Sequence, residues 1–362
     1  MLYYLSNLTD FYSPLNLFRY ITVRATIAAI VAFLFSLVFG RFIIAFLKAR
    51  NVHENSHKSD SKKLSEMHST KSETPTMGGV IIMSSFLIAA LLCARLGNTY
   101  VLLVLFTGVY LAVLGFVDDY IKLMFENRDG LRAKTKLIFQ ILLGVIVALV
   151  LYWTSDPNTR SLLAFPFYKN AADIGLLYII LTAVVIVSSS NGVNLTDGLD
   201  GLAAGCSVLL YLSFMIVCYI VGRIDFSGYL HILYVPGAGE VAIVCAALVG
   251  STLGFLWYNS HPAEIFMGDT GALSLGGMAG MIAVIIKKEY LLLIIGGIFV
   301  AEALSVVLQV LSFKLFGKRI FRIAPLHHHY QFGGLSESKI TIRFWIVAAI
   351  LALFSICTLK IR

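Results

Sequence analysis

Long apolar runs dominate this chain and decide what it can fold into. A helix needs about 20 mostly apolar residues to cross a bilayer. Ten segments qualify, at about 22–47, 79–97, 100–117, 135–153, 174–190, 202–222, 240–258, 271–286, 290–313 and 343–361. Only 13% of the residues are charged, whereas soluble chains average about 25%. We therefore predict an all-α integral membrane protein with about ten transmembrane helices, forming a single membrane domain over residues 1–362.

Lysine and arginine are spread unevenly among the loops between these segments. Most of them follow the odd-numbered segments, and the positive-inside rule places such loops in the cytoplasm. Because the number of crossings is even, both termini are then expected outside. The net charge of +8 is interpreted as this topological signal. Nucleic acid is not an expected partner, because the cations form no dense patch with interleaved aromatic residues.

The stretch NGVNLTDGLDG, residues 191–201, is polar and glycine-rich and lies between two apolar segments. We expect that it cannot form an ordinary helix. Its two amides and two carboxylates are Asn191, Asn194, Asp197 and Asp200. One of them, Asp200 for example, is expected to cap the helix that starts near Leu202. Capping does not explain the whole set, and a helix N-terminus is a favourable place for an anion. The stretch therefore predicts a binding loop at the membrane boundary.

Three further carboxylates stand at predicted helix ends on the same side. Asp118 and Asp119 end one apolar segment, and Asp118 precedes Lys122 by four residues. That spacing fits an ordinary helix ion pair, but carboxylates beside a lysine also suit phosphate chemistry, where cations bring anionic reactants together. Asp269, in the run FMGDTG, is either a helix N-cap or an oxygen ligand for Mg²⁺.

Three other features have both a structural and a functional interpretation. The triplet His327–His329 lacks a Cys or Glu at zinc-ligand spacing, so we favour imidazoles that bond to phosphate near pH 7. Phe266 is either a packing residue or a platform for a base. Glu302 lies deep in the ninth apolar segment, where a carboxylate usually faces a partner or a cavity. The sequence names no partner for it, and a purely structural role is an equal alternative.

These motifs, in this order, resemble the phospho-N-acetylmuramoyl-pentapeptide transferase family of bacteria, translocase I, within the polyprenyl-phosphate N-acetylhexosamine-1-phosphate transferases. The resemblance rests on HSTKSETPTMGG, GFVDDYIK, NGVNLTDGLDGLA, WYNSHPAEIFMGDTGAL, PLHHHY and ITIRFW. It implies transfer of phospho-MurNAc-pentapeptide from its UDP carrier to undecaprenyl phosphate, giving lipid I and UMP in peptidoglycan synthesis. It also implies a Mg²⁺ cofactor, a homodimer and a place in the bacterial cytoplasmic membrane, with the active site on cytoplasmic loops and helix ends.

The resemblance further implies roles for individual residues. Asp118 would be the base that deprotonates the lipid phosphate or, in a two-step scheme, the nucleophile, while Asp269 would bind Mg²⁺ with support from Asp119. The nucleotide-sugar site would be lined by Lys71, Asn194, Asp197, Gly198, Leu199, Asp200, Asn259, Phe266 and Gln309, with Phe266 stacked on uracil. Phosphates would be contacted by Lys122, Lys134, His327 and His328, with His327 counted among the catalytic residues.

Two other functions remain open. A sister transferase acting on UDP-GlcNAc would share the aspartates. A lipid transporter would place polar residues and broken helices near the bilayer midplane, whereas the polar motifs here gather at one predicted face. Two places also depart from the family pattern: residues 51–73 are richer in Ser and Lys and lack a Gly-Pro element, and Gln331 stands where an acidic residue is common.

Overall fold

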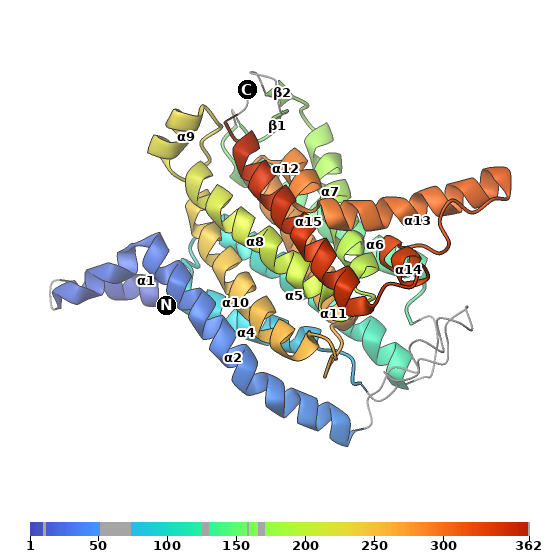
Figure 1. Ribbon diagram of the computed structural model, residues 1–362. Helices are drawn as coiled ribbons and strands as arrows, with labels where there is room; N and C mark the ends of the chain where they lie inside the picture. The colour runs from blue at the N-terminus through green and yellow to red at the C-terminus, as the bar shows by residue number, and fades with distance from the viewer. Residues whose placement is uncertain (10–11, 51–73, 125–129, 158, 166–170, 361–362) are drawn as a thin grey trace.

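The computed structural model describes residues 1–9, 12–50, 74–124, 130–157, 159–165 and 171–360 (Figure 1). Within these ranges, nine helices are long and apolar enough to cross a membrane. They are α2 (Ile21–Ala49), α5 (Thr99–Met124), α6 (Ala133–Thr154), α7 (Leu177–Thr196), α8 (Leu202–Val221), α10 (Val241–Asn259), α11 (Gly268–Ile285), α13 (Gly297–Phe316) and α15 (Glu337–Thr358). A further apolar helix, α4 (Gly79–Cys93), has 15 residues. The predicted helical membrane fold is thus confirmed, with nine long helices and one short one.

Short elements connect these helices. They are α1 (Leu2–Leu5), η1 (Ser6–Leu8), η2 (Ser13–Arg19), α9 (Ile224–Leu230), η5 (Ala238–Glu240), α12 (Glu289–Ile295) and α14 (Leu326–Gln331). Between α6 and α7, strands β1 (Leu162–Leu163) and β2 (Ala172–Asp173) pair antiparallel, with Leu162 opposite Asp173. This small hairpin is an exception to the all-helical prediction and does not change the fold class.

Two predictions about helix boundaries are wrong. The predicted helix at 290–313 is two helices, α12 and α13, which meet at Gly296. Glycine is a weak helix former and a frequent site of kinks, and beyond it α13 runs outward across its neighbours (Figure 1).

The stretch at 191–201 was expected to be non-helical, yet α7 continues to Thr196. Its polar side chains bond back to the helix: Asn191 donates to the Val187 carbonyl, and the Thr196 hydroxyl donates to the Gly192 carbonyl, both at 2.8 Å. Polar residues are therefore accommodated in the last turns of α7, and the non-helical turn begins at Asp197.

Helices α10 and α11 form the centre of the bundle. In the most apolar 18-residue window of each helix, 83% of the residues of α10 and 89% of those of α11 are buried, against 28% of those of α2. Small residues allow this close packing, as is common in membrane helices. A Cβ on Gly276 of α11 would lie 2.3 Å from the Ser189 carbonyl of α7, and one on Gly115 of α5 would lie 2.3 Å from the Asp269 carbonyl. The packing thus brings α5 and α7 against the first half of α11.

Met1 and Lys360 lie at the end of the bundle opposite the start of α11. The Met1 ammonium donates to the Leu91 carbonyl near the end of α4, and the start of α4 packs on α11. Near the other terminus, Lys360 donates to the Tyr229 carbonyl in α9, just beyond the far end of α8. Met1 and Lys360 thus lie at the same end of the bundle.

A buried ion pair fastens α2 to η5 at that same end. The Arg24 guanidinium, 1% exposed, donates to both carboxylate oxygens of Glu240 at 2.7 and 2.8 Å and to the Cys93 carbonyl at 3.2 Å. Because a buried charge is costly without its partner, Glu240 is the residue that allows Arg24 to be buried.

Replacing Glu240 with alanine is therefore expected to destabilise the protein by about 3 kcal/mol, since removing one partner leaves the other charge buried and unpaired. Thermal unfolding of the purified protein in detergent measures this. Asp225→Ala is the matched control, because it breaks the exposed Arg223–Asp225 pair and should leave the melting temperature unchanged. Equal melting temperatures for the two variants would contradict the expectation.

Candidate active site

The TPTMGG and FMGDTG motifs meet through their backbones. Phe266 N donates to the Pro75 carbonyl at 2.9 Å, while Gly78 N and Gly79 N donate to the carbonyls of Phe266 and Met267, both at 2.8 Å. A Cβ on Gly79 would lie 2.1 Å from the backbone nitrogen of Gly271, so this contact needs a residue without a side chain. The pairing fixes the first turn of α11, which carries Asp269.

Asp119 holds that first turn from the neighbouring helix α5. Its Oδ1 accepts a hydrogen bond from Asp269 N at 3.1 Å, and its Oδ2 accepts from Thr270 N at 3.0 Å and from Thr270 Oγ1 at 2.8 Å. The first amides of a helix lack intrahelical partners, and no local side chain caps α11. The N-cap interpretation of Asp269 is therefore wrong, because Asp119 supplies the cap and the Asp269 carboxylate bonds to side chains of other helices.

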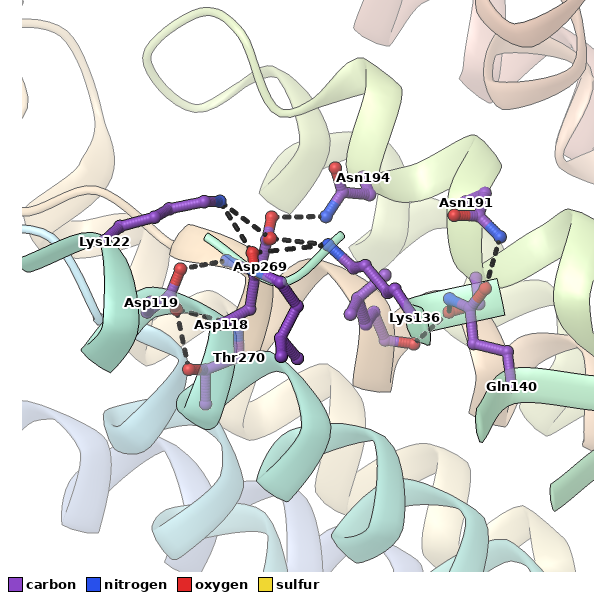
Figure 2. Close-up of polar contacts among 12 residues, drawn as sticks. Asp118, Asp119, Lys122, Lys136, Gln140, Asn191, Asn194, Asp269 and Thr270 are labelled. Atoms are coloured by element: carbon purple, nitrogen blue, oxygen red, sulfur yellow. Dashed lines mark hydrogen bonds and ion pairs between the residues drawn. The ribbon is translucent and has the colours of Figure 1, made fainter. Parts of the chain in front are cut away.

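Asp118 and Asp269 share two lysines (Figure 2). Lys122 Nζ lies 2.7 Å from Asp118 Oδ2 and 2.9 Å from Asp269 Oδ2, which confirms the helical ion pair predicted from the i, i+4 spacing. Lys136 Nζ lies 2.6 Å from Asp269 Oδ2 and 3.5 Å from Asp118 Oδ2. Asn194 donates to Asp269 Oδ1 at 2.6 Å. Helices α5, α6, α7 and α11 thus converge on one charged cluster, in which Asp118 is 1% exposed.

Lys136 is a site residue that the sequence analysis missed. Lys134, which was predicted instead, lies exposed in the first turn of α6. Two positions along a helix differ by about 200°, so the two lysines point to opposite faces. The face toward the cluster is marked by Gln140, one turn beyond Lys136, whose Oε1 accepts from Asn191 at 2.8 Å (Figure 2). A polar glutamine inside an apolar segment is the signal that could have selected Lys136.

The three aspartates fit a divalent cation. One ligand oxygen from each of Asp118, Asp119 and Asp269 lies within 4.8 Å of the others. Mg²⁺ prefers such oxygen ligands and commonly takes only one or two protein carboxylates. Both Asp119 oxygens accept bonds from the start of α11, and Asp118 Oδ1 accepts from Leu131 N at 2.7 Å. Asp269 is instead bonded to the side chains of Asn194, Lys122 and Lys136, so a shift of side chains alone could free it to bind a metal.

The turn from Asp197 to Gly201 is held by contacts with the loop before α11. Gly201, with a left-handed φ of 72°, precedes α8, and its amide donates to Asn259 Oδ1 at 3.0 Å. Asn259 Nδ2 in turn donates to the Ile265 carbonyl at 2.9 Å. The predicted capping of α8 by Asp200 is wrong, since no side chain caps that helix. The Asp200 carboxylate instead accepts from Ala263 N at 3.2 Å and lies 2.8 Å from His261 Nδ1.

The remaining predicted residues have diverse surroundings. Gln309 holds a turn, accepting from Ile320 N at 3.1 Å and Phe321 N at 2.9 Å. His328 Nδ1 lies 3.0 Å from Gln331 Oε1. Asp197, Gly198 and Phe266 are half-buried, and Leu199 is buried.

His327 is buried beside Glu302, the residue for which the sequence named no partner. Lys71 lies outside the described residues.

Comparisons with known proteins show the family of this chain. Residues 101–287 match glycosyl transferase family 4, and residues 71–83 match the phospho-N-acetylmuramoyl-pentapeptide-transferase signature 1. Proteins named phospho-N-acetylmuramoyl-pentapeptide-transferase from Rickettsia felis, Citrifermentans bemidjiense and Geobacter sp. strain M21 are each 47% identical to this chain, and the alignments cover 96%, 100% and 97% of both chains. The chain therefore belongs to the phospho-N-acetylmuramoyl-pentapeptide transferase family.

Proposed function

We propose that this membrane protein transfers phospho-MurNAc-pentapeptide from UDP-MurNAc-pentapeptide to undecaprenyl phosphate, forming lipid I and releasing UMP. The observation that carries the proposal is the cluster in which Lys122 and Lys136 each contact both Asp118 and Asp269. Both reactants carry phosphate charge and repel one another, so a site that joins them must supply cations and hold them rigidly. Full-length similarity to transferases of this name supports the choice of substrates.

In this reaction an oxygen of the lipid phosphate attacks the sugar-linked phosphorus of the UDP carrier. A bond forms between them, the bond to the bridging oxygen breaks, and UMP leaves with that electron pair. We assign Asp118 to accept the proton of the lipid phosphate and Asp269 to hold Mg²⁺. Lys122 and Lys136 neutralise the phosphate oxygens, while Asp119 keeps Asp269 in place through the start of α11. The bound Mg²⁺ would supply charge stabilisation to the transferring phosphoryl group.

The proposal places the nucleotide-sugar on the loops around this cluster. Asn194 already contacts Asp269, and the turn from Asp197 to Asp200 follows it directly in the chain. The lining that we propose comprises Lys71, Asn194, Asp197, Gly198, Leu199, Asp200, Asn259, Phe266 and Gln309, with Phe266 against uracil. His327 and His328 complete the phosphate contacts, and Lys134, exposed in the first turn of α6, adds positive charge that helps neutralise the incoming phosphate. We further propose a homodimer whose aspartate cluster faces the cytoplasm and whose termini lie outside, in keeping with the loop charges.

The test is release of UMP by the detergent-purified protein, given UDP-MurNAc-pentapeptide and a polyprenyl phosphate. Release is expected to require the lipid phosphate. Activity with UDP-GlcNAc, and none with the MurNAc substrate, would assign the protein to the sister transferases. No release from either nucleotide sugar would contradict the proposed transferase altogether.

Removal of divalent cations with EDTA is expected to abolish UMP release, and added Mg²⁺ is expected to restore it, because the carboxylates of the cluster suit an oxygen-preferring cation. A titration of Mg²⁺ against the EDTA-treated enzyme measures the effect. Dialysed protein that never met EDTA serves as the control for irreversible damage by the chelator. Full activity in excess EDTA would show that the cluster works through its lysines alone.

A further inference from the structure

Glu302 is a fully buried carboxylate in the second turn of α13, 0% exposed. An intramembrane carboxylate is costly and calls for a specific partner. The partner is His327, from the short helix α14. The backbone nitrogen of His327 donates to Glu302 Oε1 at 3.1 Å, and its ring Nδ1 lies 3.2 Å from Oε2. Glu302 therefore contacts both the backbone and the ring of one residue of the His triplet.

The opposite edge of the His327 ring faces the turn that follows α7. A Cβ added to Gly198 would lie only 2.3 Å from His327 Nε2, so the ring occupies the space that a side chain would need there. His327 is 1% exposed, and Nε2 has no hydrogen-bond partner among the described residues. Buried polar atoms are normally satisfied. An unsatisfied Nε2 beside a predicted binding turn points to a ligand atom as its partner.

We propose that Glu302 is a positioning residue for His327. Its carboxylate accepts hydrogen bonds from the backbone N–H and from Nδ1–H, and it thereby presents Nε2 at Gly198 to a phosphate oxygen of the nucleotide-sugar substrate. The hydrogen bond of one ring nitrogen decides the role left to the other. The Nδ1–Oε2 contact is at ion-pair distance without full hydrogen-bond alignment, and such contacts often tighten when substrate binds. The inference rests on the proposed role of His327 in the transferase.

Glutamine at position 302 separates this role from simple packing. It has the size of glutamate but carries an NH₂ group in place of one oxygen, so one of the two N–H groups of His327, backbone or ring, then faces a donor where an acceptor had been. Aspartate keeps two acceptors on a shorter arm. The order of activity expected is therefore wild type, then Glu302→Asp, then Glu302→Gln.

The experiment is a double-mutant cycle on UMP release with Glu302→Gln, His327→Gln and the combined variant. Glu302→Gln is expected to lower kcat by about tenfold or more, as when a carboxylate no longer fixes a histidine tautomer, with little change in KM. In the His327→Gln background the same change should have no further effect, because coupled residues are not additive. Ser305→Ala is the matched control: it removes a hydroxyl that donates to the Glu302 backbone carbonyl one turn away and should leave kcat at the wild-type value.

Three results would overturn the inference: a wild-type kcat for Glu302→Gln, losses that add in the double variant, or full activity of His327→Gln. Inactive wild-type protein would instead contradict the proposed function, so the two failures are distinguishable. Should Glu302→Gln fail to fold, Gly198→Ala tests the ring from its other edge. Its methyl group would displace the ring, and it is expected to lower kcat by a larger factor in the wild type than in the His327→Gln background.

Discussion

Asp269→Asn is expected to lower the kcat for UMP release by about 10³-fold or more, because it removes the carboxylate that we propose holds Mg²⁺ at the transferring phosphoryl group. The variant should still fold. The bonds from Asp119 go to the backbone nitrogens of residues 269 and 270 and to the Thr270 hydroxyl, and none of these groups changes. Asparagine can also keep the contact with Asn194 through its oxygen. Steady-state kinetics and the Mg²⁺ concentration for half-maximal activity measure the effect.

Asp173→Asn is the matched control for this variant. Asp173 is exposed in strand β2, and its carboxylate accepts a bond from the Gly175 amide at 2.9 Å. The hairpin follows the far end of α6 from the cluster, so the same chemical change should leave UMP release unaltered. If Asp269→Asn retained normal turnover with an unchanged Mg²⁺ requirement, the assignment of Asp269 as a metal ligand would be wrong.

Lys136→Met is expected to lower kcat by about 10²-fold or more, since the Lys136 ammonium group is one of the two that contact both Asp118 and Asp269. Methionine keeps much of the side-chain volume and removes the charge. The loss leaves Asp269 with Lys122 alone, at 2.9 Å, and weakens the cationic environment in which the two anionic reactants meet. Kinetics with each substrate varied in turn would separate turnover from binding.

Lys134→Met is the matched variant for Lys136→Met, because it makes the same chemical change in the same helix. Lys134 is exposed on the opposite face of the same helical turn, so its charge can act on an incoming phosphate only at a distance. We expect a raised KM of about threefold and a nearly unchanged kcat, as for an exposed charge that aids encounter. Equal losses of kcat for the two lysine variants would show that both reach the reacting groups.

Local sequence spacing predicted those parts of the site that depend on a single helix. The pairing of Asp118 with Lys122 follows from helical geometry, and the structure confirms it at 2.7 Å. The grouping of polar motifs on one side followed from counting apolar segments. The break at Gly296 was missed because the apolar run continues through the glycine pair Gly296–Gly297, although that pair is itself a local signal. The helical character of Asn191 to Thr196 was missed because it depends on contacts of Asn191 with Gln140 and with the Val187 carbonyl.

By itself, the sequence determined the membrane class, the approximate helices and the family, since these depend on hydropathy and on the order of motifs. Tertiary structure decided which side chains face one another. It selected Lys136 over Lys134, made Asp119 the cap of a helix 150 residues away, and gave Glu302 a partner in His327. The physical reason is that hydropathy and helical period are properties of a segment. The rotation of one helix against another is set by close packing, as at Gly115 and Gly276. It therefore cannot be predicted from the pattern within a single segment.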